Sequence, residues 1–142
     1  MATYLITGAR GGIGLELCRQ LQARGEEVIA VCRESNQELD NLGVRVESGV
    51  DITSQENVGE LVNRLNGTKL DCLINNAGIW GRNTLSNPDF DNIRHLFEVN
   101  AIGTLRITHA LLPLINDGGK IAIVTSRMGS IDDNTSGGSY GY

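Results

Sequence analysis

Short apolar runs alternate along the chain with longer stretches in which apolar residues recur at helical spacing. The apolar runs predict strands at 4–6, 27–32, 44–46, 70–74 and 120–126. Helical periodicity or capping-box spacing predicts helices at 12–21, after Ser35, after Thr53 and over 88–114. The run at 27–32 is almost continuously apolar, which is typical of a parallel strand covered on both faces. This alternation predicts an α/β fold with a parallel sheet.

The long helical stretch carries one polar residue that needs an explanation. Pro88 is expected to open the helix, and Ile93, Phe97 and Leu111 are expected on its apolar side. Asn100 falls on the same face as Ile93 and Phe97. A buried amide without hydrogen-bond partners costs about 1–3 kcal/mol. Asn100 is therefore either a satisfied core residue or a functional one.

Composition and charge restrict the class of protein. The 142 residues are 40% hydrophobic and 20% charged, which indicates one ordinary globular domain over residues 1–142. The net charge of −5 and the pI of 4.9 do not provide the excess of positive charge that binding to nucleic acid or to an anionic membrane requires. The apolar runs are far shorter than the roughly 20 residues of a membrane-spanning helix. We expect neither nucleic acid nor a membrane as a partner.

The cysteines and histidines suggest no metal chemistry. Cys18, Cys32 and Cys72 are odd in number and lie in apolar surroundings, so we expect buried, reduced thiols. His95 and His109 have no partners at metal-ligand spacing and are expected to be surface or satisfied helix residues. Met1 to Thr3 lead directly into the first strand without a leader pattern, so a cytoplasmic location is expected.

A glycine-rich turn joins the first strand to the first helix. Residues 7–14 read T-G-A-R-G-G-I-G. Gly8 allows a sharp turn, Gly12 leaves room for a pyrophosphate at the backbone, and Gly14 allows close helix–strand packing. The free N–H groups at the helix start would face the phosphates. The alternative is a glycine-rich connection that binds nothing.

The order of the motifs resembles the short-chain dehydrogenase/reductase family. The glycine pattern T-G-x-x-x-G-x-G, the N-N-A-G at 75–78, Asn100, and Ser126 followed by Tyr142 carry the resemblance. The general G-x-G-x-x-G fingerprint fails, because its third glycine falls at Leu17. Residues 126–138 are similar in particular to the C-factor-like group of these reductases.

The expected sheet is doubly wound and Rossmann-like, with strand order 3-2-1-4-5. The chain carries only part of the sheet that the pattern requires. We expect the C-terminal part of the sheet and the substrate-binding half to follow it. Either the sequence is a section of a longer reductase or it is a truncated chain. A chain that truly ended at Tyr142 would bind NADPH weakly, with essentially no turnover.

The resemblance implies NADP as the cofactor, with NAD less expected. Arg33 follows the second strand, where the general fingerprint has an acid near Cys32, and a guanidinium there pairs with a 2′-phosphate. Arg10 is expected to reach the same phosphate, while Glu34 nearby is a complication. The alternative for either arginine is a solvated surface side chain.

The same resemblance assigns the other half of the cofactor. Asp51 would accept a hydrogen bond from the adenine amino group with Ile52 beside the ring, although Asp51 also precedes a helix cap. The N-N-A-G segment would contact the ribose and the nicotinamide side. The expected cofactor-binding residues are Gly8, Arg10, Gly11, Gly12, Ile13, Gly14, Arg33, Asp51, Ile52, Asn76, Ala77 and Gly78.

The implied reaction is hydride transfer between the nicotinamide and a small carbonyl compound or secondary alcohol. Ser126 would bind the carbonyl oxygen, Tyr142 would transfer the proton, with Tyr140 as the fallback, and Asn100 would order a relay water. The family's lysine, four residues after the tyrosine, would lower the phenol pKa but falls beyond the sequence.

A non-catalytic NADP-binding or signalling protein is the alternative, since the lysine falls outside the chain. An extended-type epimerase is disfavoured by the glycine spacing. The family usually forms homo-dimers or homo-tetramers.

Overall fold

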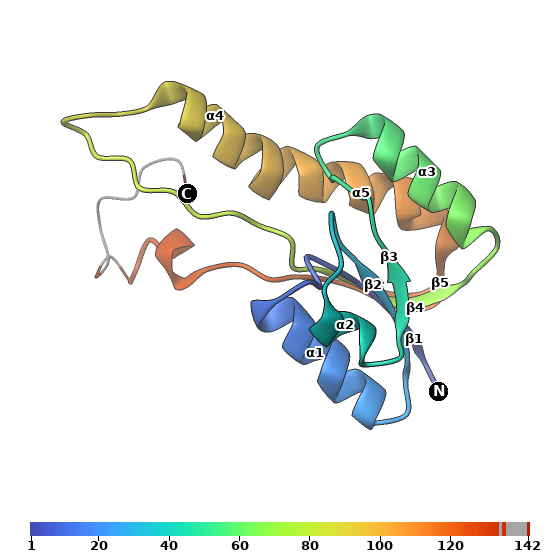
Figure 1. The fold of residues 1–142 in the computed structure, drawn as a ribbon. Coiled ribbons are helices and arrows are strands. Elements are labelled where there is room, and N and C mark those ends of the chain that lie inside the picture. The colour runs from blue at the N-terminus through green and yellow to red at the C-terminus, as the bar shows by residue number, and fades with distance from the viewer. Residues whose placement is uncertain (134, 136–141) are drawn as a thin grey trace.

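A five-stranded parallel sheet forms the centre of the computed structural model, which describes residues 1–133, 135 and 142 (Figure 1). The strands are β1 (Thr3–Thr7), β2 (Glu27–Val31), β3 (Arg45–Glu47), β4 (Leu70–Asn75) and β5 (Ile115–Ile123). Their order is β3-β2-β1-β4-β5, and every neighbouring pair is parallel. The predicted fold class and strand order are confirmed.

Helices cover both faces of this sheet. They are α1 (Gly12–Ala23), α2 (Gln37–Asp40), α3 (Gln55–Leu65), α4 (Phe90–Phe97) and α5 (Thr104–Leu111). Figure 1 shows α1 and α2 on one side of the sheet and α3, α4 and α5 on the other. Each side has its own buried cluster, with Cys18 and Leu39 in one and Leu61 and Ile107 in the other. None of the described helices is both long and apolar enough to cross a membrane.

The long helical segment corrects one prediction about the core. The helix begins at Phe90 rather than Pro88, because Asp89 caps it by accepting from the N–H groups of Asp91 and Asn92. Phe97 was expected in the core but is 59% exposed. The buried residues are instead Leu96, Val99, Ile107 and Leu111. The π-helical turn η1 (Glu98–Gly103) joins α4 to α5 and follows Phe97, so the face of α4 that meets the core is the neighbouring one, which carries Leu96.

The fifth strand begins earlier than predicted. Leu70 pairs with Ile115 but Cys72 pairs with Lys120, so β5 carries extra residues at this point. Gly118 adopts a φ of +79° within this bulge. Gly118 and Gly119 therefore lie inside the irregular strand rather than before it, because a bulge absorbs residues that the partner strand lacks.

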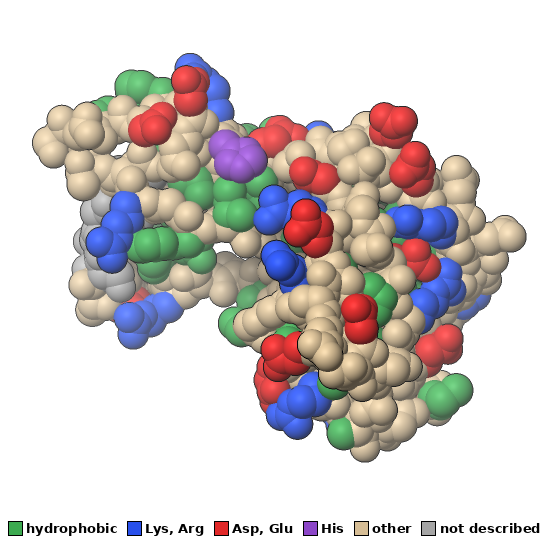
Figure 2. All heavy atoms as spheres, viewed as in Figure 1, with side chains coloured by type: hydrophobic (Ala, Val, Ile, Leu, Met, Phe, Trp, Pro, Cys, Tyr) green, Lys and Arg blue, Asp and Glu red, His purple; other side chains and the backbone are tan. Residues whose placement is uncertain are grey.

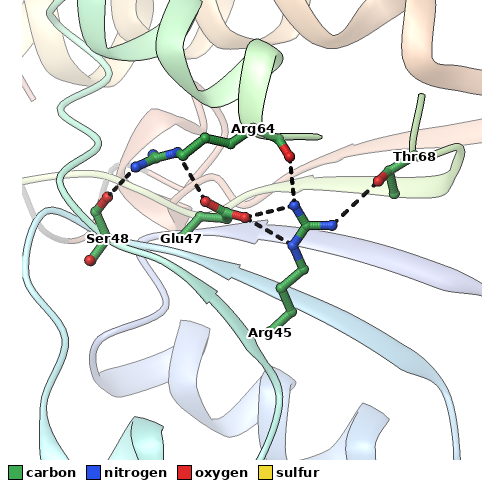
Figure 3. A network of polar contacts seen from close by, with 5 residues as sticks. All are labelled: Arg45, Glu47, Ser48, Arg64 and Thr68. Carbon is green, nitrogen blue, oxygen red and sulfur yellow. Dashed lines mark hydrogen bonds and ion pairs between the residues drawn. The ribbon is translucent and has the colours of Figure 1, made fainter. Parts of the chain in front are cut away.

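A polar network fastens the short strand β3 to α3 (Figure 3). Glu47, 8% exposed, accepts from Arg45 Nη2 at 2.8 Å and from Arg64 Nε at 3.0 Å. The two guanidinium groups also reach the carbonyl oxygens of Arg64 and Ser48 and the hydroxyl of Thr68. Both carboxylate oxygens of Glu47 are thereby paired with an arginine. These contacts hold the end of β3, from which the chain continues toward Val50.

The cysteines are free, as expected. Cys18 and Cys32 are buried, while Cys72 is only partly buried. Burial raises the pKa of Cys18 to about 11. The described residues hold no group of three or more His, Cys, Asp or Glu side chains that is arranged for a metal ion.

Candidate functional site

A cavity of about 480 Å³ opens at the carboxyl edge of the sheet. In open α/β sheets this edge is where ligands bind. The lining combines the ends of four strands with one helix. It consists of Thr7, Gly8, Arg10, Val31, Cys32, Arg33, Glu34, Val50, Asp51, Ile52, Ala77, Gly78, Ile79, His95 and Val99.

The glycine turn leaves open space before α1. Gly8 and Gly12 have φ values of +67° and +55°, the left-handed region that favours glycine. A Cβ atom added at Gly11 or Gly12 would meet no heavy atom within 4 Å. The N-cap residue, Gly11, makes no side-chain capping bond, so the first N–H groups of α1 are available to a ligand. The turn therefore fits the phosphates of a dinucleotide.

Gly14 has a different role from Gly11 and Gly12. A Cβ atom there would lie 2.3 Å from the carbonyl oxygen of Gly8 and 2.6 Å from Asn76 Nδ2. Its missing side chain lets α1 pack directly on the turn, as the sequence predicts. Ile13 is 62% exposed beside it, and neither residue lines the cavity.

The N-N-A-G segment holds the glycine turn in place. Asn76 Nδ2 donates to the carbonyl oxygens of Thr7 at 3.1 Å and Gly8 at 3.2 Å. The Thr7 hydroxyl accepts from the N–H groups of Asn76 and Ala77, each at 3.0 Å. Ala77 and Gly78 line the cavity, whereas the Asn76 amide is engaged with the turn. The geometry therefore gives Asn76 a positioning role toward the turn.

Asp51 and Arg33 lie in the same part of the cavity. Asp51 Oδ1 accepts from the Thr53 N–H at 2.9 Å and from the Thr53 hydroxyl at 2.7 Å. The backbone hydrogen bond is the main cause that lowers the pKa of Asp51, and the charges of Arg33 and His95 add to it. Asp51 Oδ2 has no hydrogen-bond donor among the described residues, so it can accept from a ligand. Asp51 precedes the helix cap, as expected, and the cap itself is Ser54, one residue after Thr53, at which the capping-box spacing begins.

Arg10 and Arg33 both line the cavity and are exposed to solvent. Asn36, the N-cap of α2, donates to the carbonyl oxygen of Arg10 at 3.0 Å and thereby ties the glycine turn to the segment after β2. Figure 2 shows Lys or Arg side chains and a histidine around a recess on this face, with hydrophobic side chains between them. Glu34 also lines the cavity, so it adds a second carboxylate, besides Asp51, to the lining that holds the two arginines.

Asn100 lies in the π-helical turn and joins it to the loop after β4. Its Oδ1 accepts from the Ile79 N–H at 2.8 Å, and its Nδ2 donates to the Ile79 carbonyl at 2.9 Å. The backbone carbonyl of Asn100 accepts from the Thr104 hydroxyl at 3.1 Å. Both polar atoms of the amide thus have a backbone partner, and short π-helical turns often mark functional sites.

Ser126 follows β5 and caps the short 3₁₀ helix η3 (Arg127–Gly129). Its Oγ accepts from the Met128 N–H at 3.1 Å, which leaves the hydroxyl proton free to donate. Tyr142 is 46% exposed, and Tyr140 lies outside the described residues. Asn100, Ser126 and Tyr142 are absent from the described cavity lining, whereas Gly8, Arg33 and Asp51 belong to it.

Sequence reasoning missed part of the lining. His95 was expected to be a surface or satisfied helix residue, and Val50, Ile79 and Val99 were not assigned to the site. His95 and Val99 are four residues apart on the helix, so they share a face. That spacing was the available signal, although the sequence alone does not show which face meets the sheet edge.

Comparisons with known proteins point to one family. A family model for short chain dehydrogenase matches residues 2–141. A 1-hydroxy-2-glutathionyl-2-methyl-3-butene dehydrogenase of Rhodococcus sp. (strain AD45) is 47% identical over 144 residues, covering 100% of this chain and 64% of that protein. The C-signal protein of Myxococcus xanthus is 46% identical over 76 residues, covering 51% of this chain and 46% of that protein.

Two solved structures are similar along the whole chain. A short-chain dehydrogenase/reductase from Burkholderia multivorans with bound NADP has a TM-score of 0.90 and 30% identity, covering 99% of this chain and 65% of that one. A carbonyl reductase from Pseudomonas aeruginosa PAO1 has a TM-score of 0.91 and 30% identity, covering 100% of this chain and 69% of that one. The chain thus spans only part of the length of these relatives.

Proposed function

Since the chain belongs to the short-chain dehydrogenase family, we propose that it is the cofactor-binding part of an NADP-dependent oxidoreductase. The protein would transfer a hydride between the nicotinamide and a small carbonyl compound or secondary alcohol. The observation that carries this proposal is the cavity in which Gly8, Arg33 and Asp51 converge from three strand ends.

The cofactor is held in this proposal by groups of distinct chemistry. The N–H groups at the start of α1 bind the pyrophosphate, Arg10 and Arg33 bind the 2′-phosphate, and Asp51 accepts from the adenine amino group. Ile52 flanks the base, and Ala77 and Gly78 let the ribose approach the backbone. The bound NADP in the Burkholderia multivorans structure supports this choice of cofactor. When bound, the cofactor supplies or accepts the hydride.

The reacting groups would come from the segments next to the cavity. The Ser126 hydroxyl donates to the carbonyl oxygen and stabilises the charge that develops there. Tyr142 transfers the proton to or from that oxygen. Asn100 fixes the loop after β4 through Ile79 and orders the water that relays the proton.

The substrate is a small molecule in this proposal. The Rhodococcus relative is named for a hydroxylated glutathionyl compound, and the Pseudomonas relative for carbonyl reduction. Both names agree with alcohol–carbonyl chemistry. The similarity to C-signal favours the alternative of a non-catalytic signalling protein, which would bind NADPH without turnover.

We also propose a cytoplasmic homo-dimer or homo-tetramer. Phe97, Leu105 and Leu112 are 59%, 69% and 54% exposed along one continuous helical segment. Large apolar side chains left in water along a helix are typical of an interaction surface. A measurement of the molecular mass in solution tests the oligomeric state.

The experiment that tests the reaction uses Ser126→Ala in the intact protein. Loss of one donor to a developing oxyanion lowers kcat by about 10²–10³-fold. NADPH affinity should stay within about twofold of wild type, because Ser126 does not line the cavity. Ser86→Ala, an exposed serine in the loop before α4, is the matched control. An unchanged kcat in Ser126→Ala would refute the assigned role.

A further inference from the structure

His95 lies at the solvent-exposed rim of the cavity, and neither the sequence motifs nor the proposed function assigns it a role. It is on α4 and lines the cavity together with Val99, which is one helical turn further on. Val99 is buried, whereas His95 is exposed. Val99 therefore lines the inner part of this side of the cavity, and His95 lines its solvent-exposed part.

The neighbours of His95 identify which part of the cavity it adjoins. Its charge acts on Asp51, as does that of Arg33, and all three residues line the cavity. Ile52, next to Asp51, lines the same region. This is the end of the cavity that the proposed function assigns to adenine, at the opposite end of the bound dinucleotide from the nicotinamide.

The side chain of His95 is available for a ligand. Within the described part of the chain its imidazole takes part in no hydrogen bond and no ion pair. The adjacent Arg94 is already paired with Asp91 at 2.7 Å and does not line the cavity. His109, on α5, is also exposed but lies away from the cavity. His109 therefore provides a control for substitutions of His95.

We propose that His95 forms the outer wall of the adenine pocket, with its ring packed against one face of the base while Asp51 accepts from the amino group. This inference rests on the proposed NADP function and adds to it a residue that determines affinity for the adenosine half. Adenine has two apolar faces and a polar edge, which matches an aromatic ring at the rim and a carboxylate beside it. Stacking of a base on an aromatic side chain is sequence-tolerant and contributes substantially to binding.

The test compares three variants of the intact protein: His95→Ala, His95→Phe and, as the control, His109→Ala. The dissociation constants of NADPH and of 2′,5′-ADP, which lacks the nicotinamide half, are measured by calorimetry. His95→Ala should raise both dissociation constants by about 10-fold. His95→Phe should stay within about threefold of wild type, because it keeps an aromatic face, and His109→Ala should change neither constant. At saturating NADPH, kcat should be unchanged in His95→Ala while the KM for NADPH rises.

Each other outcome overturns the inference in a distinct way. Unchanged affinity in His95→Ala, with wild type binding NADPH, rejects the role of His95 and leaves the proposed function intact. Equal losses in His95→Ala and His95→Phe reject an aromatic wall. If His95→Ala loses affinity for NADPH but not for 2′,5′-ADP, the contact between His95 and adenine is rejected. If wild type binds neither ligand, the proposed function fails as well.

Discussion

Replacing Gly14 by alanine perturbs the contact on which the glycine turn depends. The new Cβ would lie 2.3 Å from the Gly8 carbonyl oxygen and 2.6 Å from Asn76 Nδ2. The first of these atoms belongs to the backbone, so no side-chain rotation relieves the overlap. Helix α1 must move away from the turn, and Asn76 must give up its bonds to the Thr7 and Gly8 carbonyls.

The expected loss of stability follows from these contacts. Overpacking costs about 1–3 kcal/mol. The two hydrogen bonds of Asn76 are worth about 1 kcal/mol each. Alanine recovers about 1 kcal/mol through its better helix propensity. Gly14→Ala should therefore lower the free energy of unfolding by roughly 2–4 kcal/mol, and lower Tm by about 10 °C.

Gly11 and Gly12 provide matched controls within the same turn. Gly11→Ala meets no atom and needs no left-handed backbone, so its stability should stay within about 0.5 kcal/mol of wild type. Gly12→Ala also meets no atom but retains a φ of +55°, which costs about 1–2 kcal/mol. Urea unfolding with a check on the m-value measures all three variants. If the Gly14→Ala and Gly11→Ala variants have the same free energy of unfolding, the reasoning is refuted.

Three further predictions concern charge and burial. Glu47→Gln should destabilise the protein by about 2 kcal/mol in urea unfolding, because two guanidinium groups lose their shared carboxylate, while Glu38→Gln, an exposed control, should have little effect. Cys18, with its pKa raised to about 11, should resist iodoacetamide at pH 8 until urea unfolds the protein; rapid labelling of the native state would contradict its burial. Asp51 has a lowered pKa, so its stabilising effect is present above its ordinary pKa of 3.8 and is lost as the pH falls through the lowered value. Asp51→Asn should therefore be less stable than wild type at pH 7 and differ less from it at pH 2, and an equal difference at both pH values would argue against the Thr53 contact.

The fold was predictable because its signals are local. The apolar run at 27–32 and the glycines at 8, 12 and 14 specify a strand, a turn and a close helix contact within a few residues of each other. Together with the alternation of strands and helices and the family resemblance, these features predict the parallel sheet and its order, which the structure confirms.

The errors arose where distant contacts decide the outcome. Phe97 fits an ideal helical stripe, but packing buries the neighbouring stripe, which carries Leu96 and Val99. The π-helical turn that follows Phe97 also makes a distant contact, because Asn100 bonds to Ile79 in the loop after β4. His95 joins the cavity only because α4 is packed so that His95 shares its wall with Asp51, in the loop after β3, which helical periodicity does not specify.

The measurement that tests the central claim most directly is a titration of the intact protein with NADPH and with NADH. The account predicts saturable binding of one dinucleotide per chain, with NADPH bound at least about 10-fold more tightly because charge-assisted bonds to its 2′-phosphate come from Arg10 and Arg33. Arg33→Ala should reduce this preference and leave NADH affinity unchanged. Equal affinities would contradict the NADP assignment, and the absence of binding by either dinucleotide would contradict the account as a whole.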